Sequence, residues 1–406
     1  MERAIKKNIL FLTAVRITDP EEKGIYTDLL RKFRDEGHSV YVVCPEERRF
    51  GGKTRLNTLS NINVLYVKSL NLQKTSLLEK GLSTVLLSWQ LFKTIKKYFE
   101  TIKFDLVLYS TPPITYNKAI NYLKRKDNCL TYLLLKDIFP QNAIDLQMMK
   151  KDGVIHKYFK KVEKKLYNLS DFIGCMSQAN LNYVIKNNPE LEKTKLEVNP
   201  NSIEVKESAL KFEIDIYSKY NIPRGKIIFI FGGNLGVPQG IEFLKKNIAY
   251  CKSVSEAFFL IVGDGTEYQD FNNWIQIECI KNALLIKELP KSEYDEIINL
   301  SHVGLIFLNP HFSIPNFPSR ILSYMQNRLP VICATDLVTD IGKIAVENNF
   351  GYKCLTTDFE AFFDYVIKLL NKELREQMGN NSYNFLINEY NTDISYNKII
   401  KKINTK

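Results

Sequence analysis

The stretch FIFGGNLGVPQGIEFLKK, residues 229–246, contains the transition on which the fold depends. A run of apolar residues ends at Gly232 and Gly233, turns through Gly236 and Gly240, and continues into a segment with helical spacing. Glycines let a backbone approach a phosphate closely, and a helix start supplies unpaired N–H groups. The spacing is not GxGxxG, so a tight turn that binds nothing explains this stretch equally well.

Apolar runs of strand length alternate with helix-length segments along most of the chain. In the first half they cover 8–15, 39–44, 62–67, 104–110, 129–135 and 171–177, and in the second half 226–233, 257–263, 283–288, 303–308 and 329–334. Near-continuous apolar strands between helices are what a parallel sheet covered on both faces requires. Because the series starts twice, we predict an α/β protein with two doubly wound, Rossmann-like domains that face each other across a cleft.

The domain boundaries follow from composition. A polar, turn-rich join follows EVNPNSIEV, residues 197–205, and separates the two series of strands. We predict an N-terminal domain over 1–205, a C-terminal domain over 206–385, and a last helix over 386–406 that could cross back to the first domain. A length of 406 residues agrees with two such domains.

Charge and cysteine content limit the possible partners and the compartment. The net charge of +11 favours binding of phosphates, whether of nucleic acid, anionic lipid or a small molecule. The seven cysteines are scattered and form no CxxC, which argues against a disulfide framework and a zinc site. The first residues lack the features of a signal peptide, and the longest mostly apolar stretch, 81–92, is shorter than the about 20 residues that span a bilayer. We therefore expect a cytoplasmic protein that is not transmembrane.

A second glycine turn occurs in LIVGDGTEYQDF, residues 260–271, where Gly263, Asp264 and Gly265 end another strand. Carboxyl ends of parallel strands meet at one edge of a sheet, so this turn could hold a nucleotide base or ribose next to the first turn. Asp264 is explained equally well as a helix cap.

The stretch IPNFPSRILSYMQNRLPVI, residues 314–332, places a proline-rich loop before a helix. Pro315 and Pro318 stiffen the loop, and Ser319 is expected to cap the helix. Arg320 then lies in the first turn, where a positive charge is unfavourable to the helix dipole unless an anion binds there. We predict that Arg320 binds a diphosphate; the alternative is a surface or salt-bridged arginine.

These blocks resemble, in content and order, the family 4 glycosyltransferases of GT-B fold, in particular the branch used in bacterial capsule and O-antigen assembly. The resemblance rests on GGNLGVPQG (232–240), VGDG (262–265), PSRILSYMQNRLPVI (318–332) and TD (339–340), together with DEGHSVYVVC (35–44). It implies a retaining, metal-independent enzyme that moves a sugar from a nucleotide donor, expected to be UDP-linked, to a polyprenyl-diphosphate-linked saccharide. The absence of a DxD triplet agrees with metal independence, and no cofactor is expected.

The resemblance also assigns the donor site. The donor-binding residues are predicted to be Gly232, Gly233, Asn234, Gly236, Gln239, Gly263, Asp264, Gly265, Pro318, Ser319, Arg320 and Ser323. The sequence departs from the family at Ser323, where a glutamate normally holds the donor ribose. An arginine and a lysine of the first glycine block are also replaced, by Gly233 or Asn234 and by Gln239. Arg320 is then the only cationic phosphate contact that these motifs supply.

Two loops of the first half resemble acceptor-side loops, namely STPPITY (110–116) and LLLKDIFPQNAIDL (133–146). The predicted acceptor-binding residues are Gly24, Thr111, Pro112, Pro113 and Asp137. Asp137 and Arg320 are predicted to be catalytic. A carboxylate in a desolvated site suits proton transfer from an acceptor hydroxyl, although a helix cap or a salt bridge with Lys136 explains Asp137 equally well.

The segment KKDGVIHKYFKKVEKKLYNL, residues 150–169, predicts a basic amphipathic helix. Ile155, Tyr158 or Phe159, Val162 and Leu166 recur at helical spacing, and lysines fill the other face. Such a helix either lies on anionic lipid or packs on the core with a solvated lysine face, and residues 77–99 have the same two interpretations. With the family resemblance, they place the protein peripherally at the inner face of the plasma membrane.

Two other functions fit the same architecture. A non-hydrolysing UDP-sugar epimerase would need more carboxylates and histidines at the site than the sequence offers. A basic binding protein, for nucleic acid or as an inactive GT-B partner of another transferase, gains support from Ser323. We expect a transferase with no nucleic-acid partner.

Overall fold

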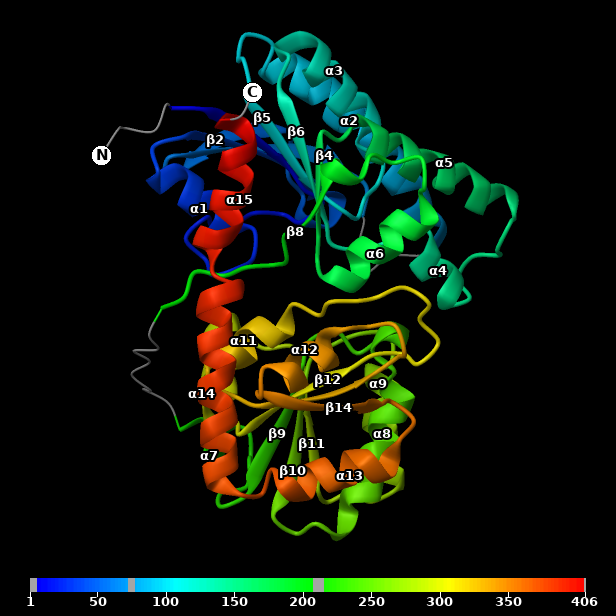
Figure 1. Ribbon diagram of the computed structural model, residues 1–406, viewed down its shortest axis with the longest axis vertical. Helices are drawn as coiled ribbons and strands as arrows, with labels where there is room; N and C mark the ends of the chain where they lie inside the picture. Colours follow the sequence, from blue (N-terminus) through cyan, green and yellow to red (C-terminus); the bar gives the residue numbers. More distant parts are fainter. Residues whose placement is uncertain (1–5, 72–76, 207–214, 405–406) are drawn as a thin grey trace. The chain divides into compact units, whose positions relative to one another are not determined.

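The computed structural model describes residues 6–71, 77–206 and 215–404, with the side chains of 77–85 left out, and the chain forms two compact units (Figure 1). The first unit comprises Met1–Glu204 together with Asn391–Lys406, and the second comprises Val205–Tyr390. The chain thus passes into the second unit after Glu204 and returns for its last helix.

The first unit contains an eight-stranded sheet with the order β3-β4-β2-β1-β5-β6-β7-β8. Its strands are β1 Asn8–Leu12, β2 Ser39–Glu47, β3 Arg55–Leu59, β4 Ile62–Ser69, β5 Leu106–Ser110, β6 Leu130–Leu135, β7 Phe172–Cys175 and β8 Leu196–Val198. All neighbours are parallel except β3, which runs antiparallel to β4. The central strands are buried on both faces, as their uninterrupted apolar runs require.

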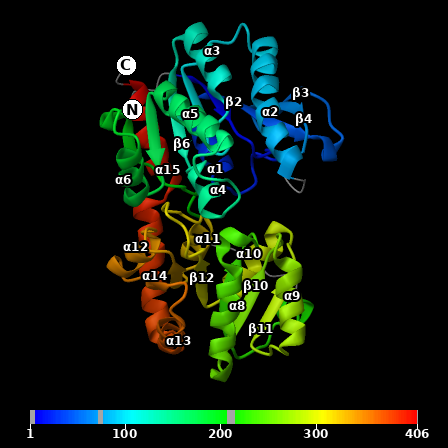
Figure 2. The same cartoon turned by 90° about the vertical axis from the view of Figure 1, so that its right-hand side faces the viewer.

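Helices cover both faces of this sheet (Figure 2). They are α1 Thr27–Asp35, α2 Leu77–Tyr98, α3 Asn117–Asp127, α4 Gln141–Asp145, α5 Val154–Leu169, α6 Gln178–Asn187 and α15 Thr392–Asn404. Helices α1 and α15 share a core with one face, where the rings of Phe33 and Tyr396 lie 5.0 Å apart. At the end of α2, Phe99 lies 5.5 Å from the ring of Tyr41 on β2. The last helix therefore belongs to the first unit because its apolar side chains complete that core.

The second unit contains a six-stranded sheet, all parallel, with the order β11-β10-β9-β12-β13-β14. Its strands are β9 Ile227–Gly232, β10 Ala257–Val262, β11 Ala283–Ile286, β12 Val303–Phe307, β13 Val331–Thr335 and β14 Gly351–Leu355. Its helices are α7 Ile216–Lys219, α8 Ile241–Tyr250, α9 Tyr268–Ile277, α10 Lys291–Leu300, α11 Arg320–Gln326, α12 Ile341–Glu347, α13 Phe359–Lys368 and α14 Lys372–Glu389. The prediction of two Rossmann-like, doubly wound domains is confirmed.

Each sheet has one point where the strand order reverses. In the first unit it lies between β1 and β5, and in the second between β9 and β12, because successive strands are added on opposite sides of these pairs. Ligands of open α/β sheets bind beyond the carboxyl ends of the strands at such points. The loops that follow these four strands are therefore where a site is expected.

All eleven predicted strands are present, and three further strands were not predicted. β3, β8 and β14 are edge strands; β3 has no fully buried residue, and in β14 only Gly351 is buried. Such strands lack the continuous apolar run by which the others were found. Within the described residues, no helix combines the length and the apolar character needed to cross a membrane.

Candidate functional site

The site in the second unit begins where two loops meet at the β9–β12 switch point. The amide of Asn309, two residues after β12, donates to the carbonyl of Pro238 in the glycine loop at 3.0 Å. Gly240 has a φ of +60°, and a Cβ there would lie 3.0 Å from the carbonyl oxygen of Leu308. The loop after β9 thus needs glycine before α8 because of both its backbone conformation and this close approach.

Arg320 lies against the first glycine turn of this loop. Its guanidinium carbon is 4.3 Å from the centroid of the Phe231 ring, and a Cβ on Gly233 would lie 3.4 Å from it. Its Nη1 is buried and has no hydrogen-bond partner among the described residues. Burial lowers the pKa of Arg320. A buried, unsatisfied cationic donor is costly, and an anion bound beside Gly233 would remove that cost.

Two tyrosines that the sequence analysis missed complete this corner. Tyr324, on α11, accepts a hydrogen bond from the amide of Gly232 at 3.1 Å. Tyr294, on α10, occupies the space beside Gly232, and a Cβ at that glycine would collide with its hydroxyl. Gly232 is therefore required to make room for a tyrosine, whereas the sequence analysis assigned it to a ligand. No local sequence pattern connects a residue of α10 with a glycine of β9.

The two glycine turns pack against each other. A Cβ at Gly263 would collide with the carbonyl oxygen of Gly233, and one at Gly265 with that of Leu235. The amides of Gly233 and Leu235 donate to Val262 O and Asp264 O, both at 2.9 Å. These two amides are consequently not available to a phosphate. The glycines of the second turn are needed for this packing, which the sequence did not reveal.

Polar side chains of these turns mostly bind their own loops. Asn234 Nδ2 donates to Gln239 Oε1 at 2.9 Å, across the turn that contains Gly236. Asp264 Oδ1 accepts from the amide of Gly265 at 2.9 Å. Helix α9 begins four residues after Asp264, with Glu267 at its N-cap position, so the alternative that Asp264 caps this helix is wrong.

The loop before α11 is held by a buried carboxylate. Asp336 accepts from the amide of Thr339 at 2.7 Å and from its hydroxyl at 2.8 Å, and Thr339 Oγ1 in turn accepts from the amide of Asn316 at 3.1 Å. Ser319, which follows Pro318, stands at the N-cap position but its side chain makes no capping hydrogen bond, so the predicted cap is wrong. Ser323 lies one turn after Arg320 on α11 and is partly buried.

The predicted acceptor loops of the first unit meet beyond the carboxyl ends of β5 and β6. The hydroxyl of Thr111, directly after β5, donates to the carbonyl of Asp137 at 3.1 Å and accepts from the amide of Lys136 at 3.2 Å. Pro112 and Pro113 follow, each preceded by a cis peptide bond. The loops after β5 and β6 are therefore joined, and they bring Thr111 and Asp137 together.

The carboxylate of Asp137 is shielded from solvent. Its carboxylate accepts a hydrogen bond from Asn142 at 2.8 Å, and burial raises its pKa to about 6. Helix α4 begins after Pro140, so Asp137 is not its cap, and no salt bridge between Asp137 and Lys136 is present among the described residues. Burial also lowers the pKa of Lys136 to about 7. The sequence analysis mentioned this lysine only as an ion-pair partner and missed its perturbed character.

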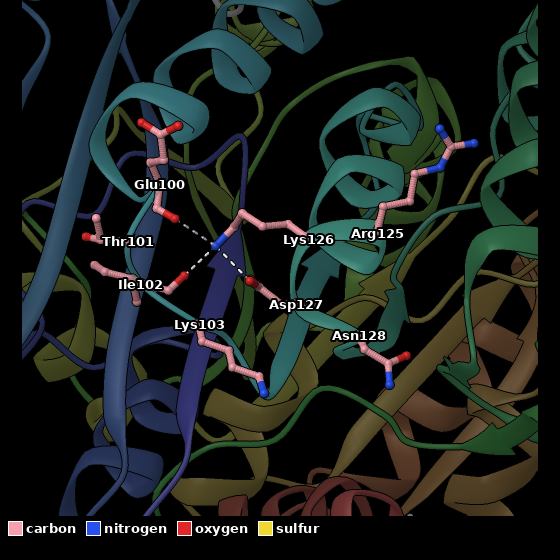
Figure 3. Close-up of a pocket in the computed structure, with 8 residues that line it drawn as sticks. All are labelled: Glu100, Thr101, Ile102, Lys103, Arg125, Lys126, Asp127 and Asn128. Atoms are coloured by element: carbon pink, nitrogen blue, oxygen red, sulfur yellow. Dashed lines mark hydrogen bonds and ion pairs between the residues drawn. The ribbon is translucent and has the colours of Figure 1, made fainter.

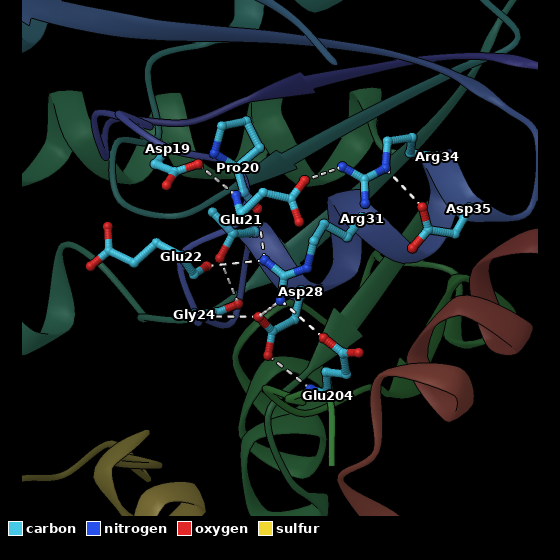
Figure 4. A network of polar contacts seen from close by, with 11 residues as sticks. Asp19, Pro20, Glu21, Glu22, Gly24, Asp28, Arg31, Arg34, Asp35 and Glu204 are labelled. Carbon is cyan, nitrogen blue, oxygen red and sulfur yellow. Dashed lines mark hydrogen bonds and ion pairs between the residues drawn. The ribbon is translucent and has the colours of Figure 1, made fainter. Parts of the chain in front are cut away.

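Gly24 lies in the loop between β1 and α1, and its amide takes part in a network of hydrogen bonds and ion pairs (Figure 4). Its amide donates to Asp28 Oδ1 at 2.9 Å, and the same oxygen lies 2.6 Å from a guanidinium nitrogen of the buried Arg31. Arg31 also donates to the carbonyl of Pro20 at 2.6 Å, and Asp28 accepts from the amide of Glu204 at 2.8 Å. The buried pair thus fixes the shape of the loop that contains Gly24.

A surface pocket lies at the amino ends of the strands of the first sheet, opposite the ends where the predicted acceptor residues are found (Figure 3). Residues 100–103 and 125–128 line it, just before β5 and β6 begin. Lys126 Nζ is engaged there by the carbonyl of Ile102 at 2.5 Å and by Asp127 at 2.7 Å. Over the described ranges of the chain, no group of three or more histidine, cysteine, aspartate or glutamate side chains is placed to hold a metal ion.

Comparisons with known proteins agree with this organisation. Residues 213–385 match the family model described as Glycosyl transferases group 1. Over 374 residues the chain is 22% identical to the probable glycosyltransferase WbjE of Pseudomonas aeruginosa, which covers 88% of this chain and 90% of WbjE. Its fold is similar to that of sucrose-phosphate synthase from Thermosynechococcus elongatus, with a TM-score of 0.75 at 14% identity over 98% of this chain and 99% of that one.

A second similar structure is Anabaena HepE in complex with UDP-glucose, with a TM-score of 0.68 at 14% identity over 98% of this chain and 100% of that one. At such identities the solved structures establish the fold, whereas the family match and the WbjE alignment concern the activity. The chain is a glycosyltransferase with the GT-B fold, and its residues 213–385 are similar to the group 1 glycosyl transferases.

Proposed function

We propose that the protein transfers a sugar, with retention of configuration, from a UDP-sugar to a hydroxyl of a polyprenyl-diphosphate-linked saccharide during synthesis of a surface polysaccharide. The observation that carries the donor half of this proposal is Arg320, whose buried Nη1 has no partner among the described residues and lies beside the glycine turn. The UDP-glucose complex of the similar HepE structure supports UDP as the nucleotide.

The donor diphosphate would bind between Arg320 and the start of α8. Arg320 supplies a fixed charge, and the start of α8, which follows Gly240, supplies the positive end of a helix dipole and the amides of Ile241 and Glu242, since those of Phe243 and Leu244 donate to Gly240 O. As the bond between the sugar and the diphosphate breaks, negative charge grows on the leaving oxygen. Preorganised donors of this kind lower such a barrier by about 3 kcal/mol.

Asp137 would act on the acceptor. A carboxylate whose pKa is about 6 is ionised at neutral pH and is still basic enough to receive or orient a hydroxyl proton. Its hydrogen bond to Asn142 fixes the orientation of the carboxylate, and Thr111 fixes the backbone on which it stands. Thr111, Pro112 and Pro113 would line the same acceptor region.

Peripheral attachment to an anionic membrane is supported by the first turns of α5. Val154, Ile155 and Tyr158 are 86%, 62% and 51% exposed, and Met148 in the preceding segment is 58% exposed. Leu166, three turns later, is fully buried. The buried residues of the amphipathic helix, Glu163, Leu166 and Tyr167, thus all lie in its second half. Exposed lysines flank the apolar residues, namely Lys150, Lys151, Lys157 and Lys161, as expected of a surface that lies on anionic lipid.

The test of this function is thermal unfolding with a panel of nucleotides, followed by product analysis. Saturation to 100 times the dissociation constant stabilises the folded state by about 2.7 kcal/mol, so UDP should raise the unfolding temperature whereas DNA should not. Incubation with a UDP-sugar and a synthetic polyprenyl-diphosphate saccharide should then give a product whose anomeric configuration equals that of the donor. No response to any nucleotide would refute the proposal.

One observation favours a second candidate, an inactive partner of another transferase. Ser323 stands where the family normally has the glutamate that holds the donor ribose, and a serine cannot supply that charge. This candidate would be supported against the enzyme if the protein bound UDP but neither transferred the sugar to any acceptor nor hydrolysed the UDP-sugar.

A further inference from the structure

A buried glutamate holds two arginines together at the carboxyl end of β2. Glu46 is 2% exposed, and Arg16, in the loop after β1, contacts it through both Nε, at 2.8 Å, and Nη2, at 3.3 Å. Arg55, at the start of β3, lies 3.5 Å from the same carboxylate. A Cβ at Gly52 would collide with Glu46, so the chain leaves room for this carboxylate.

A second buried glutamate holds a third arginine beside the first two. Glu47 is 3% exposed, and Arg49 lies 3.2 Å from it. The guanidinium carbons of Arg16 and Arg49 lie 4.8 Å and 4.7 Å from the centroid of the Phe50 ring, which is 46% exposed. We call Arg16, Arg49 and Arg55, with Glu46 and Glu47, the arginine cluster.

The charges of this region do not balance. Within residues 46–55, two acidic side chains, Glu46 and Glu47, stand beside four basic ones, Arg48, Arg49, Lys53 and Arg55, and Arg16 adds a fifth through its contact with Glu46. The two buried carboxylates require cations, because an unpaired buried charge is strongly destabilising, but two cations would meet that need. The structural requirement therefore accounts for only part of the positive charge.

Each arginine of the cluster also retains donors. Arg16 uses Nε and Nη2 on Glu46, Arg49 uses Nη2 on Glu47, and Arg55 uses Nη1 on Glu46 and on the carbonyl of Lys53. Among the described residues, none accepts a hydrogen bond from Arg16 Nη1, Arg49 Nη1 or Arg55 Nη2. Guanidinium groups fixed by carboxylates, each with a free edge, suit the oxygens of phosphate.

We propose that the arginine cluster binds the phosphate or diphosphate group of the acceptor. This proposal rests on the proposed function and deepens it, since it names the part of the acceptor that the first unit recognises. The cluster lies at the carboxyl edge of the first sheet, directly after β1 and β2 and beside the switch point between β1 and β5. Glu46 and Glu47 are positioning residues, and the exposed Phe50 offers an apolar surface next to the charges.

The test is isothermal titration of the full-length protein with saturating UDP present, so that the donor site is occupied. The probes are farnesyl diphosphate, farnesol and glucose 6-phosphate. The variants are Arg49→Gln and Arg55→Gln, because each of these arginines contacts a glutamate through one nitrogen, whereas Arg16→Gln would remove two hydrogen bonds to the buried Glu46. The control is Arg125→Gln, which makes the same charge change at the amino ends of the strands of the same sheet.

We expect farnesyl diphosphate to bind, farnesol not to bind, and each cluster variant to weaken binding about ten-fold, which corresponds to the loss of one charge-assisted hydrogen bond. The Arg125→Gln control should bind as the wild type does. If glucose 6-phosphate binds with the same dependence and farnesyl diphosphate does not, the cluster recognises a sugar phosphate instead of a lipid diphosphate. If both cluster variants bind either phosphate probe as the wild type does, or neither probe binds, the proposal is overturned.

The thermal response to UDP separates this outcome from failure of the proposed function. Arg49→Gln and Arg55→Gln should show the wild-type UDP response. If the protein binds a phosphate probe through these arginines but shows no thermal response to UDP, the proposal for the arginine cluster stands and the proposed UDP-sugar donor is refuted. If the protein responds normally to UDP but binds neither phosphate probe, the proposed donor stands and the proposal for the arginine cluster is refuted.

Discussion

The guanidinium of Arg320 lies over the ring of Phe231, 4.3 Å from its centroid, and this contact holds the cation beside Gly233 without neutralising it. A cation–π contact contributes roughly 0.5–2 kcal/mol, but it supplies no hydrogen-bond acceptor. The Nη1 group stays unsatisfied among the described residues, in a position fixed by the end of β9 and the start of α11. Arg320 thus has a fixed guanidinium with one unsatisfied donor, which is the basis of the proposal that it binds an anion.

Arg320→Ala should therefore remove most of the stabilisation by UDP. The loss of a charge-assisted, buried donor is expected to weaken UDP binding by about 2–3 kcal/mol, or about a hundred-fold. Arg224→Ala is the matched control, since Arg224 also lies over an aromatic ring, that of Tyr217 at 4.8 Å, but is 65% exposed. Titration calorimetry should show a change only for Arg320, and equal affinities in the two variants would exclude Arg320 from the donor site.

Gly265→Ala should destabilise the second unit because the new methyl group would meet the carbonyl oxygen of Leu235, which is backbone and cannot turn away. Overpacking of this kind costs about 3 kcal/mol. Gly225→Ala, at a φ of +74° with nothing within 4 Å, should cost only about 1 kcal/mol from backbone strain.

Both glycine variants are best measured in a Trp89→Phe background. The chain has two tryptophans, so Trp274 on α9 then reports chemical unfolding of the second unit alone. A smaller loss of stability for Gly265→Ala than for Gly225→Ala would show that the two glycine turns do not pack as described.

Asp137 should make stability depend on pH between its ordinary pKa and its raised one. The folded-state pKa of about 6 lies above the ordinary pKa of an aspartate, so the folded protein holds this proton more tightly than the unfolded chain does. The contribution of Asp137 is present below about pH 4 and is lost as the pH rises to about 6. Asp137→Asn should remove this dependence and should be more stable than the wild type at pH 7. Urea unfolding at pH 4.5 and pH 7 tests this, and an unchanged pH dependence would contradict it.

The same variant separates stability from catalysis. Asp137→Asn keeps the size of the side chain but cannot accept a proton, so transfer should fall by about a hundred-fold or more while UDP affinity stays unchanged. Asn142→Ala removes only the hydrogen bond that orients the carboxylate and should reduce transfer less. Transfer by Asp137→Asn at the wild-type rate would assign Asp137 a purely structural role.

The sequence predicted those features that a local pattern encodes. The central strands were found because burial on both faces demands a continuous apolar run. The position of Arg320 at a helix start was also predicted, whereas its role in binding an anion stays a prediction. Tyr294 and Lys136 were missed for another reason. The constraint of Tyr294 on Gly232 joins residues far apart in the chain, and the lowered pKa of Lys136 arises from burial, which no spacing reveals. The same limit applies to the arginine cluster, whose members come from three separate segments.

The exposed start of α5 leads to a prediction about lipid. Replacing Val154 and Ile155 by serine should weaken binding to vesicles that contain anionic lipid by about ten-fold or more, since burying each such side chain contributes about 1.5–3 kcal/mol when complete. Because both residues are solvent-exposed, the folded state should lose little stability. Ile277→Ser is the control, at a 76% exposed isoleucine of the second unit. Lysines near an anionic surface add about 1 kcal/mol each, so neutral vesicles should bind the wild type more weakly than anionic ones. In a co-sedimentation assay, equal binding of the wild type and the double serine variant would show that this helix does not carry the membrane contact.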